Sequence, residues 1–469
     1  MKELFDNPPP PESENCLTMN IFAPSTPGPP GGRAVLVFIP GGGFQSGGTH
    51  RYDLASFAAN EDIVAVTFNY RTNIFGFPAS PAIPLVERNL GLLDQRFGLD
   101  WIRDNIYAFQ GDPSMVTLWG ISAGAESNDA HILMYGGSQQ PPFRAVILES
   151  GLISFGLVGS RPEDNNLGNW NRMLQATNCS STSDTAALNC LRDVPASRLK
   201  SIMEESRIDF APIIDNVTIP ANPAQKRASG NFAKVPILTG TVAEEGRSLI
   251  NNKISMQDFS RAFLNPALFP GDTASQIISS YPRIKDMTDF DIGAAVFTDF
   301  LYQCVRPPSP PSPLPLSLPS PLLPLLTLLN KQTQPTSLLS QQTSSLSTPV
   351  WRYYLNISLP SFLPANATWL GKYHGVEYPI FFIDIDDTRH TPQSYALTNF
   401  VRSAWGRFVR NPEGGPGWSA VGGRFGGSVA VLGDAGTVRG SGATIVDERE
   451  LDGRCSMFEG VLRGLAGLG

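Results

Sequence analysis

The sequence predicts an α/β fold with a mostly parallel central sheet, helices on both faces and a helical cap region. Apolar runs typical of strands alternate with longer helical segments, a pattern typical of parallel sheets. The run at 34–40 is continuously apolar, as expected for a buried central strand. Another run, 116–119, leads directly into Gly-Ile-Ser-Ala-Gly at 120–124 and then into a helix-tolerant segment. The whole chain, 1–469, is predicted to be one domain.

The remaining elements are predicted from apolar periodicity and from Pro and Gly breaks. Strands are predicted at the end of 13–24 and at 34–40, 63–70, 116–119, 144–148, 235–240 and 350–355. Helices are predicted at 52–59, 89–109, 394–409 and 455–462, and a largely helical, polar cap at 160–300. The Gly-rich stretch 411–443 carries no predicted element. Residues 306–349, dominated by Pro, Leu, Ser, Thr and Gln, are predicted to be a disordered, low-complexity insert outside the working enzyme. The alternative is a genuine surface loop.

Composition argues against several classes of function. The 469 residues are 41% hydrophobic and 16% charged, which is enough for a large buried core. A formal net charge of −7 argues against a nucleic-acid or anionic-membrane partner. No apolar run has the length of a transmembrane helix, and no signal peptide opens the chain. Four Asn-x-Ser/Thr sequons nevertheless favour a secreted chain, at Asn178, Asn216, Asn356 and Asn366.

The Gly-x-Ser-x-Gly stretch has the form of a nucleophile elbow, the sharp strand-to-helix turn of α/β-hydrolases. Gly120 and Gly124 are expected where a β-carbon would clash. The helix N-terminus behind Ser122 favours developing negative charge. The alternative is a serine in an ordinary turn between a strand and a helix.

A nucleophilic serine needs a general base, and the chain has four histidines. His374 follows the strand at 350–355 and fits the order Ser, acid, His of α/β-hydrolases. His131 lies inside the helix after the elbow, where a structural role is expected. His50 and His390 lie in polar turns and are expected at the surface.

The acid and the oxyanion donors are sought at the ends of predicted strands. Glu244 and Glu245 follow the strand at 235–240, and spacing alone admits either one as the partner of the histidine. Backbone N–H groups of Gly42 and Gly43, after the central strand, could converge with that of Ala123 on an oxyanion. The alternatives are a flexible turn or a dinucleotide loop, but the chain has no Gly-x-Gly-x-x-Gly fingerprint with an acidic partner. It also shows no Walker motif or metal-ligand cluster, so no cofactor and no metal are expected.

Several longer motifs point to one family. They are Ser-Glu-Asn-Cys-Leu at 13–17, Gly-Gly-Gly-Phe at 41–44, Asn-Tyr-Arg at 69–71, Asn-Leu-Gly-Leu-Leu-Asp-Gln-Arg at 89–96 and His-Gly at 374–375. With them the chain resembles the type-B carboxylesterase/lipase family, the cholinesterase-like branch of the α/β-hydrolases, and is most similar to fungal secreted members. The resemblance covers residues 13–305 and 350–463.

The resemblance assigns roles that spacing leaves open. It selects Glu245 over Glu244, because the family acid directly precedes a glycine. It implies that Arg71 and Asp94 form a structural ion pair, and that Ser150 supplies a hydroxyl that hydrogen-bonds the acid. The chain departs from the family at Ile121, because the family usually has a glutamate immediately before the nucleophile.

The resemblance also implies the disulfides. Cys179 is expected to pair with Cys190, and Cys304 with Cys455. Cys16 is then expected to stay a free thiol, because the family places its partner in an N-terminal region that is missing here.

The function expected from these observations is hydrolysis of a small-molecule or lipid ester through an acyl-enzyme, with Ser122, His374 and Glu245 as the triad. The alternatives are a catalytically silent cholinesterase-like binding protein, since some relatives are silent, or a defective, truncated gene product. Secretion is expected from the family and the sequons. The sequence indicates neither the oligomeric state nor the acyl and alcohol parts of the substrate.

Overall fold

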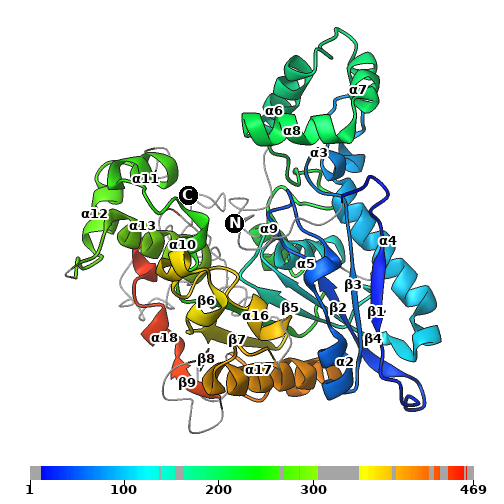
Figure 1. Cartoon of the computed structure of the whole chain (residues 1–469), viewed down its shortest axis with the longest axis vertical. Coiled ribbons are helices and arrows are strands. Elements are labelled where there is room, and N and C mark those ends of the chain that lie inside the picture. Colours follow the sequence, from blue (N-terminus) through cyan, green and yellow to red (C-terminus); the bar gives the residue numbers. More distant parts are fainter. Residues whose placement is uncertain are drawn as a thin grey trace, which may run out of the picture.

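The computed structural model describes residues 12–304 and 348–461, apart from 137–138, 154–162, 265, 267–268, 285, 383–386, 422–426, 434–441 and 459–460. In the described part of the chain, the centre is a nine-stranded sheet of order β1-β3-β2-β4-β5-β6-β7-β8-β9 (Figure 1). Only the outermost pairs, β1–β3 and β8–β9, are antiparallel. The predicted insert at 306–349 lies outside the described residues except for 348–349.

The elements have the following bounds. The strands are β1 (Met19–Phe22), β2 (Arg33–Ile39), β3 (Val64–Phe68), β4 (Gly111–Ile121), β5 (Ala145–Glu149), β6 (Ile237–Val242), β7 (Val350–Leu355), β8 (Ser428–Leu432) and β9 (Ala443–Asp447). The helices are α2 (Ala55–Glu61), α3 (Asn73–Gly76), α4 (Leu90–Asn105), α5 (Ala123–Met134), α6 (Glu163–Ala176), α7 (Asp184–Asp193), α8 (Ala196–Ser206), α9 (Pro223–Ala228), α10 (Gly246–Leu249), α11 (Met256–Phe263), α12 (Thr273–Ser279), α13 (Asp289–Thr298), α16 (Tyr378–Phe381), α17 (Pro392–Arg410) and α18 (Glu448–Leu451).

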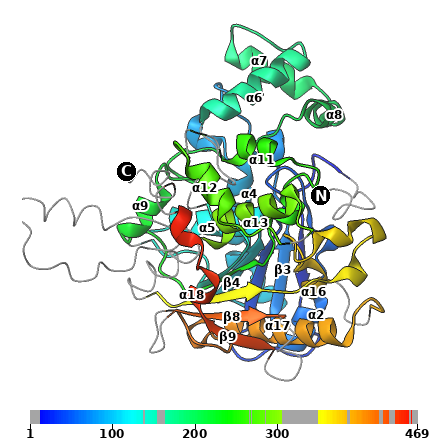
Figure 2. The same cartoon turned by 90° about the vertical axis from the view of Figure 1, so that its left-hand side faces the viewer.

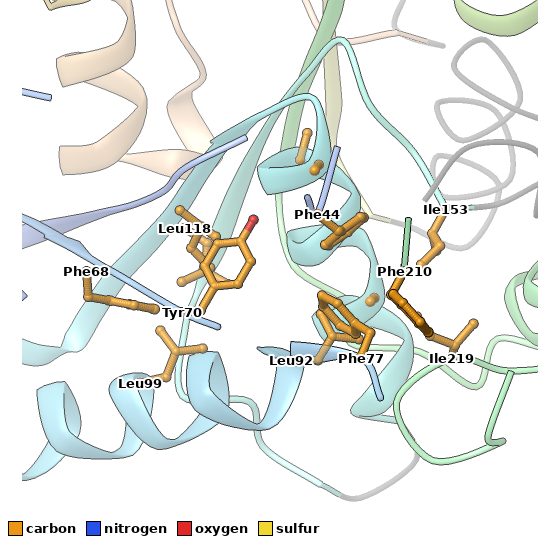
Figure 3. Packing of buried hydrophobic residues seen from close by; sticks show 14 of the residues in the cluster. Phe44, Phe68, Tyr70, Phe77, Leu92, Leu99, Leu118, Ile153, Phe210 and Ile219 are labelled. Atoms are coloured by element: carbon orange, nitrogen blue, oxygen red, sulfur yellow. The ribbon is translucent and has the colours of Figure 1, made fainter. Parts of the chain in front are cut away.

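Side chains of the central strands alternate between two hydrophobic cores. Val35 and Val37 of β2 face a core that also contains side chains of α4 and α5. Figure 3 shows part of this core, with Leu118 of β4 beside Tyr70 and Leu92 of α4 beside Phe77. Both faces of β2 are fully buried, which explains its continuous apolar run.

The opposite face of the sheet packs against α2, α16 and α17, and Figures 1 and 2 both show α17 beside α2. Trp119 of β4 lies at the centre of an aromatic group. Its ring centroid is 4.6 Å from that of Phe38, 4.9 Å from that of Phe381 and 5.2 Å from that of Phe382. The strand that leads to Ser122 therefore packs against α16, which begins four residues after His374.

Helices from the predicted cap form two groups in Figure 1: α6–α8 stand apart from the sheet at the top, and α11–α13 lie at the left. The two predicted disulfides are present. Cys179 and Cys190 are bonded with a Cα separation of 5.5 Å, and Cys304 and Cys455 with a separation of 4.5 Å. Cys16 is a free thiol, as predicted. No helix in the described ranges combines the length and apolar character needed to span a bilayer.

The sequence prediction missed the last two strands. β8 lies within the Gly-rich stretch that carried no predicted element, yet all five of its residues are buried, and it pairs in parallel with β7. β9 then closes the edge in an antiparallel pairing with β8. Five-residue strands flanked by glycine carry too little periodicity to be recognised without their partners.

The glycine after the nucleophile makes a testable packing contact. A β-carbon on Gly124 would collide with the carbonyl oxygen of Ile39 in β2. We expect Gly124→Ala to destabilise the fold by about 1–3 kcal/mol, the usual cost of overpacking. Gly168 in α6 is the matched control, because a β-carbon there would meet nothing within 4 Å.

Gly168→Ala should leave stability unchanged or raise it by roughly 0.5–1 kcal/mol, through the better helix propensity of alanine. Apparent Tm values measured at one scan rate compare the two variants with the wild type. Equal Tm values for Gly124→Ala and the wild type would contradict the steric argument.

Candidate active site

Ser122 lies in the turn between β4 and α5, with a backbone conformation that non-glycine residues rarely adopt. Its φ and ψ are 57° and −125°. The turn is held from both sides, since Ser122 N–H donates to Glu149 O at 2.8 Å and Ser122 O accepts from Glu126 N–H at 2.9 Å. The side chain remains partly exposed and lines a groove. This geometry is that of the predicted nucleophile elbow.

His374 and Glu245 contact each other in the protein interior. The His374 Nδ1 atom lies 2.5 Å from Glu245 Oε2, and the two residues are 3% and 0% exposed. The second oxygen, Glu245 Oε1, accepts the Val242 N–H at 2.9 Å. Glu244 points elsewhere and accepts the backbone N–H of Lys372. Of the two carboxylates that spacing admitted, the structure thus brings Glu245 to the histidine.

The other ring nitrogen of His374 is not paired with any of the described residues. Its Nε2 atom is buried and has no hydrogen-bond partner among the described residues. With Nδ1–H donated to Glu245, Nε2 carries the lone pair of the neutral imidazole. Ser122 and His374 line the same groove, although no hydrogen bond joins them. Such bonds are often long in free enzymes and tighten when the substrate binds.

Charges around His374 set its protonation. Burial alone lowers the pKa of His374, but the charge and hydrogen bond of Glu245, together with the charge of Glu377, outweigh it, so the pKa lies above its ordinary value of 6.5. A neighbouring carboxylate stabilises an imidazolium. The two carboxylates therefore favour the imidazolium form of His374 more than its burial alone would allow.

The expectation that Ser150 hydrogen-bonds the acid Glu245 is wrong. The Ser150 hydroxyl donates to Glu377 Oε1 at 3.1 Å, not to Glu245. Both oxygens of Glu245 are already occupied, by His374 and by the Val242 N–H. Ser150 therefore contacts a second buried carboxylate, three residues after His374.

Sequence analysis missed this second carboxylate and its neighbour. Glu377 is 1% exposed, and burial, with the charge of Glu245, raises its pKa to about 7. Glu149, at the end of β5, is fully buried and accepts the Trp405 indole N–H at 2.7 Å. Burial, followed by the charge of Glu377, raises the pKa of Glu149 well above its ordinary value. The sequence does contain a signal for Glu149, because this carboxylate directly follows the apolar run of β5.

The turn after β2 presents backbone donors. Gly42 and Gly43 have φ values of 123° and 63°, and a β-carbon on Gly42 would collide with the carbonyl oxygen of Ser46. Ala123 is the first residue of α5, so its N–H has no partner within the helix. The N–H groups of Gly42, Gly43 and Ala123 donate to no acceptor in the described ranges. Gly42 and Gly43 line the groove beside Ser122.

The ion pair implied by the family resemblance is present. Arg71 Nε and Nη2 each lie 2.7 Å from an oxygen of Asp94, which is a bidentate arrangement. The Arg71 backbone N–H also donates to Asp94 at 3.1 Å. The pair therefore fixes the chain after β3 to α4.

The other histidines have other partners. His131 is fully buried with Nε2 3.0 Å from Gln95 Oε1, and burial lowers its pKa to about 3, so the ring is neutral and structural as predicted. His50 is exposed at the groove. His390, expected at the surface, is instead partly buried, with Nδ1 3.2 Å from Ser394 Oγ at the start of α17.

The groove that contains Ser122 and His374 has a volume of about 1870 Å³. Ile121 and the Gly41–Gly43 turn line it beside the nucleophile. Helices α6–α8 also line the groove, with apolar side chains at Trp170, Leu188, Leu191, Leu199 and Met203 and with charged ones at Arg192, Lys200 and Glu204. Its size exceeds the roughly 300–1,000 Å³ of pockets for drug-sized ligands, which leaves room for a long or bulky molecule.

The buried Glu377 makes a testable prediction about stability. In the unfolded chain its carboxyl loses a proton as pH rises past its ordinary pKa of 4.5, whereas the folded protein retains the proton up to about 7. The stability that this group contributes is complete below pH 4.5 and is lost as pH rises to about 7. Glu377→Gln keeps an acceptor for Ser150 but cannot titrate.

We therefore expect the Tm of Glu377→Gln, relative to the wild type, to increase between about pH 5 and pH 7. Thermal unfolding across this range measures the difference. Glu87→Gln, at an exposed position, is the control and should follow the wild type throughout. A difference that stays constant with pH would contradict the inferred pKa of Glu377.

The chain is similar to proteins of known activity. The chain is 36% identical to a chlorogenic acid esterase of Aspergillus niger over 245 residues, which are 49% of this chain and 45% of that protein. It is 35% identical to secreted lipase 1 of Botryotinia fuckeliana over 296 residues, 58% of this chain and 50% of that protein. The chain thus spans about half the length of these relatives.

A solved structure and a family model extend the comparison over the chain. The structure of a PNB esterase matches with a TM-score of 0.69 and 26% identity, covering 96% of this chain and 86% of that one. It confirms the predicted α/β-hydrolase fold. The sequence model of the carboxylesterase family matches residues 2–422. Because this match covers most of the chain, the protein belongs to the carboxylesterase family.

Proposed function

We propose that the protein hydrolyses carboxylic esters through an acyl-enzyme on Ser122. The observation that carries the proposal is the state of His374: one ring nitrogen contacts Glu245 and the other, buried and unpartnered, belongs to a residue that lines the groove with Ser122. A base placed in this way can take the proton of a serine hydroxyl. Membership of the carboxylesterase family supports the same reaction.

Acylation begins when the substrate ester lies beside Ser122. His374 Nε2 takes the hydroxyl proton as Ser122 Oγ attacks the carbonyl carbon, and the carbonyl oxygen becomes an oxyanion. The N–H groups of Gly42, Gly43 and Ala123 donate to this oxyanion. The tetrahedral intermediate collapses, and His374 gives its proton to the departing alkoxide. The alcohol is released, and the acyl group stays bound to Ser122 Oγ as an ester.

Deacylation repeats the sequence with water. His374 Nε2 takes a proton from a water molecule as its oxygen attacks the acyl carbon of the Ser122 ester. The second intermediate collapses, the proton returns to Ser122 Oγ and a carboxylic acid is released. Glu245 holds the Nδ1–H tautomer and stabilises the imidazolium in both steps.

The groove and the relatives indicate the class of substrate. The volume of the groove and the apolar residues in its lining fit an ester of a small organic molecule or a lipid with an extended acyl or alcohol part. The similar proteins named a chlorogenic acid esterase and a secreted lipase support both possibilities. The two disulfides and the secreted relative also support a protein that matures in an oxidising, secretory compartment.

Replacement of the nucleophile tests the mechanism. Ser122→Ala should reduce kcat for 4-nitrophenyl esters by about a million-fold, because no alkoxide can form. Ser201→Ala is the matched control, since among the described residues that hydroxyl bonds only to Ser197 O in its own helix. It should keep wild-type activity.

A series of acyl chain lengths measured in the same assay would define the acyl specificity. Residual turnover by Ser122→Ala equal to that of the wild type would refute the acyl-enzyme. A wild-type protein that folds, with a cooperative melting transition, but hydrolyses no ester in the series would refute the proposed activity.

The pH profile tests the base. His374 must be neutral to accept the proton, and Glu245 and Glu377 raise its pKa above 6.5. We therefore expect kcat/KM to fall as pH decreases, with an apparent pKa above 6.5. Glu245→Gln removes the hydrogen-bonded charge, so this limb should shift to lower pH while kcat falls. A limb unchanged in Glu245→Gln would show that another group titrates.

A further inference from the structure

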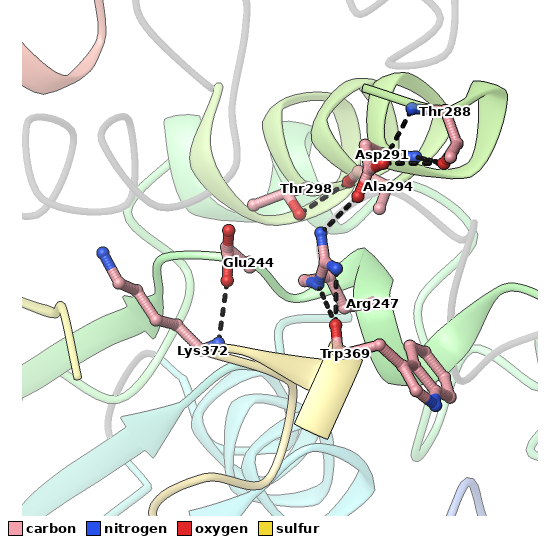
Figure 4. Close-up of polar contacts among 8 residues, drawn as sticks. All are labelled: Glu244, Arg247, Thr288, Asp291, Ala294, Thr298, Trp369 and Lys372. Carbon is pink, nitrogen blue, oxygen red and sulfur yellow. Dashed lines mark hydrogen bonds and ion pairs between the residues drawn. The ribbon is translucent and has the colours of Figure 1, made fainter. Parts of the chain in front are cut away.

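Three side chains next to Glu245 bind the segment that carries His374. Glu244, Arg247 and Ser248 flank the acid at the start of α10, and each contacts a backbone atom within 369–374. Figure 4 shows the contacts of Glu244 with Lys372 and of Arg247 with Trp369. We call these three side chains the clamp. None of its hydrogen bonds to this segment involves the imidazole ring, so the clamp acts on the backbone that carries His374.

Glu244 makes the central contact. Its Oε2 accepts the Lys372 N–H at 2.8 Å, and its own N–H donates to Lys372 O at 3.0 Å. The two segments form a parallel β-bridge at Glu244 and Tyr373. Gly371 has a φ of 60°, and a β-carbon there would collide with the Glu244 carboxylate. Side chain and backbone together fix the register of the two segments two residues before His374.

Ser248 and Arg247 hold the same segment on either side. Ser248 Oγ donates to His374 O at 3.0 Å. Arg247 Nε donates to Trp369 O at 2.8 Å, and its Nη1 lies 2.8 Å from Asp291 Oδ1 in α13. Asp291 is fixed in turn by the capping box of α13. The segment is therefore held at three positions, at Trp369, at Lys372 and at His374 itself.

We propose that Glu244 and Ser248 are positioning residues that set the separation between Glu245 and His374. This proposal rests on the proposed triad of Ser122, His374 and Glu245. The histidine and the acid come from loops after different strands, β7 and β6, and their side chains touch through one 2.5 Å contact. A displacement of about 1 Å at a reacting group can cost roughly a hundredfold in rate. Direct bonds between the two loops limit such a displacement.

The contacts of Glu244 separate two possible roles of its carboxylate, as a hydrogen-bond acceptor and as a negative charge. Its carboxylate accepts a backbone N–H and does not contact the imidazole. An amide oxygen can accept the same N–H, so Glu244→Gln should keep the clamp, whereas Glu244→Ala removes the acceptor. An electrostatic role would make both variants equally defective.

The kinetic experiment compares four variants in ester hydrolysis. We expect Glu244→Ala to lower kcat about tenfold while KM stays within twofold of the wild type. Ser248→Ala should also lower kcat. Both effects are expected on kcat because positioning acts on the chemical step. Glu244→Gln should stay within twofold of the wild type. The matched control is Asp289→Ala, which removes a carboxylate that accepts a backbone N–H, that of Met256, away from the His374 segment. It should keep wild-type kcat.

A second measurement does not depend on turnover. A histidine Nδ1–H held by a buried carboxylate gives a low-field proton NMR resonance. This resonance should be sharp in the wild type, in Glu244→Gln and in Asp289→Ala. It should broaden or disappear in Glu244→Ala and weaken in Ser248→Ala. If Glu244→Ala does not fold, Ser248→Ala, which removes one oxygen atom, carries the test together with Glu244→Gln.

The outcomes separate the two proposals. A folded wild type without esterase activity would overturn the proposed function, while loss of the resonance in Glu244→Ala would still support the clamp. An unchanged resonance and kcat in both alanine variants would overturn the clamp, even where Ser122→Ala confirms the mechanism. Equal losses in Glu244→Gln and Glu244→Ala would also overturn it, in favour of a role for the charge.

Discussion

The close packing of α5 against the end of β2 is the constraint on which the site depends. Gly124 touches the carbonyl of Ile39, and this contact leaves no room for a wider turn between β4 and α5. The turn therefore forces Ser122 to a positive φ and leaves its hydroxyl partly exposed. The same packing places the start of α5 beside the glycine turn after β2, so backbone donors from two segments lie near one serine. The positions of the proposed nucleophile and of the proposed oxyanion donors are thus consequences of one helix–sheet contact.

Local motifs predicted the parts of the fold and site whose geometry is encoded within a few residues. The elbow at 120–124 is such a motif, and so is the continuous apolar run of β2, because burial on both faces leaves a direct trace in sequence. The choice of Glu245 over Glu244 needed the family resemblance, since spacing alone admitted either. In the structure, the bond from Glu244 to the Lys372 N–H turns that side chain away from the histidine.

The features that sequence did not predict depend on partners distant in the chain. β8 and β9 become recognisable only when paired with β7 and with each other. Ser150 was expected to bind the acid, but Glu377 lies 227 residues away in sequence and takes the bond. No local pattern reveals that a carboxylate on another loop will be nearer. Such contacts follow from the order of the strands, which periodicity does not encode.

The separation of the site residues along the chain has a consequence for synthesis. Ser122, the glycine turn and Glu245 all precede residues 305–347, whereas His374 follows them. A polypeptide that terminates within that tract would carry the serine and the acid of the proposed triad without its histidine. It would also lack β7, leaving β6, whose six residues are all buried in the complete chain, as an open apolar edge. Such edges recruit strands from other molecules, so premature termination would yield an aggregation-prone product.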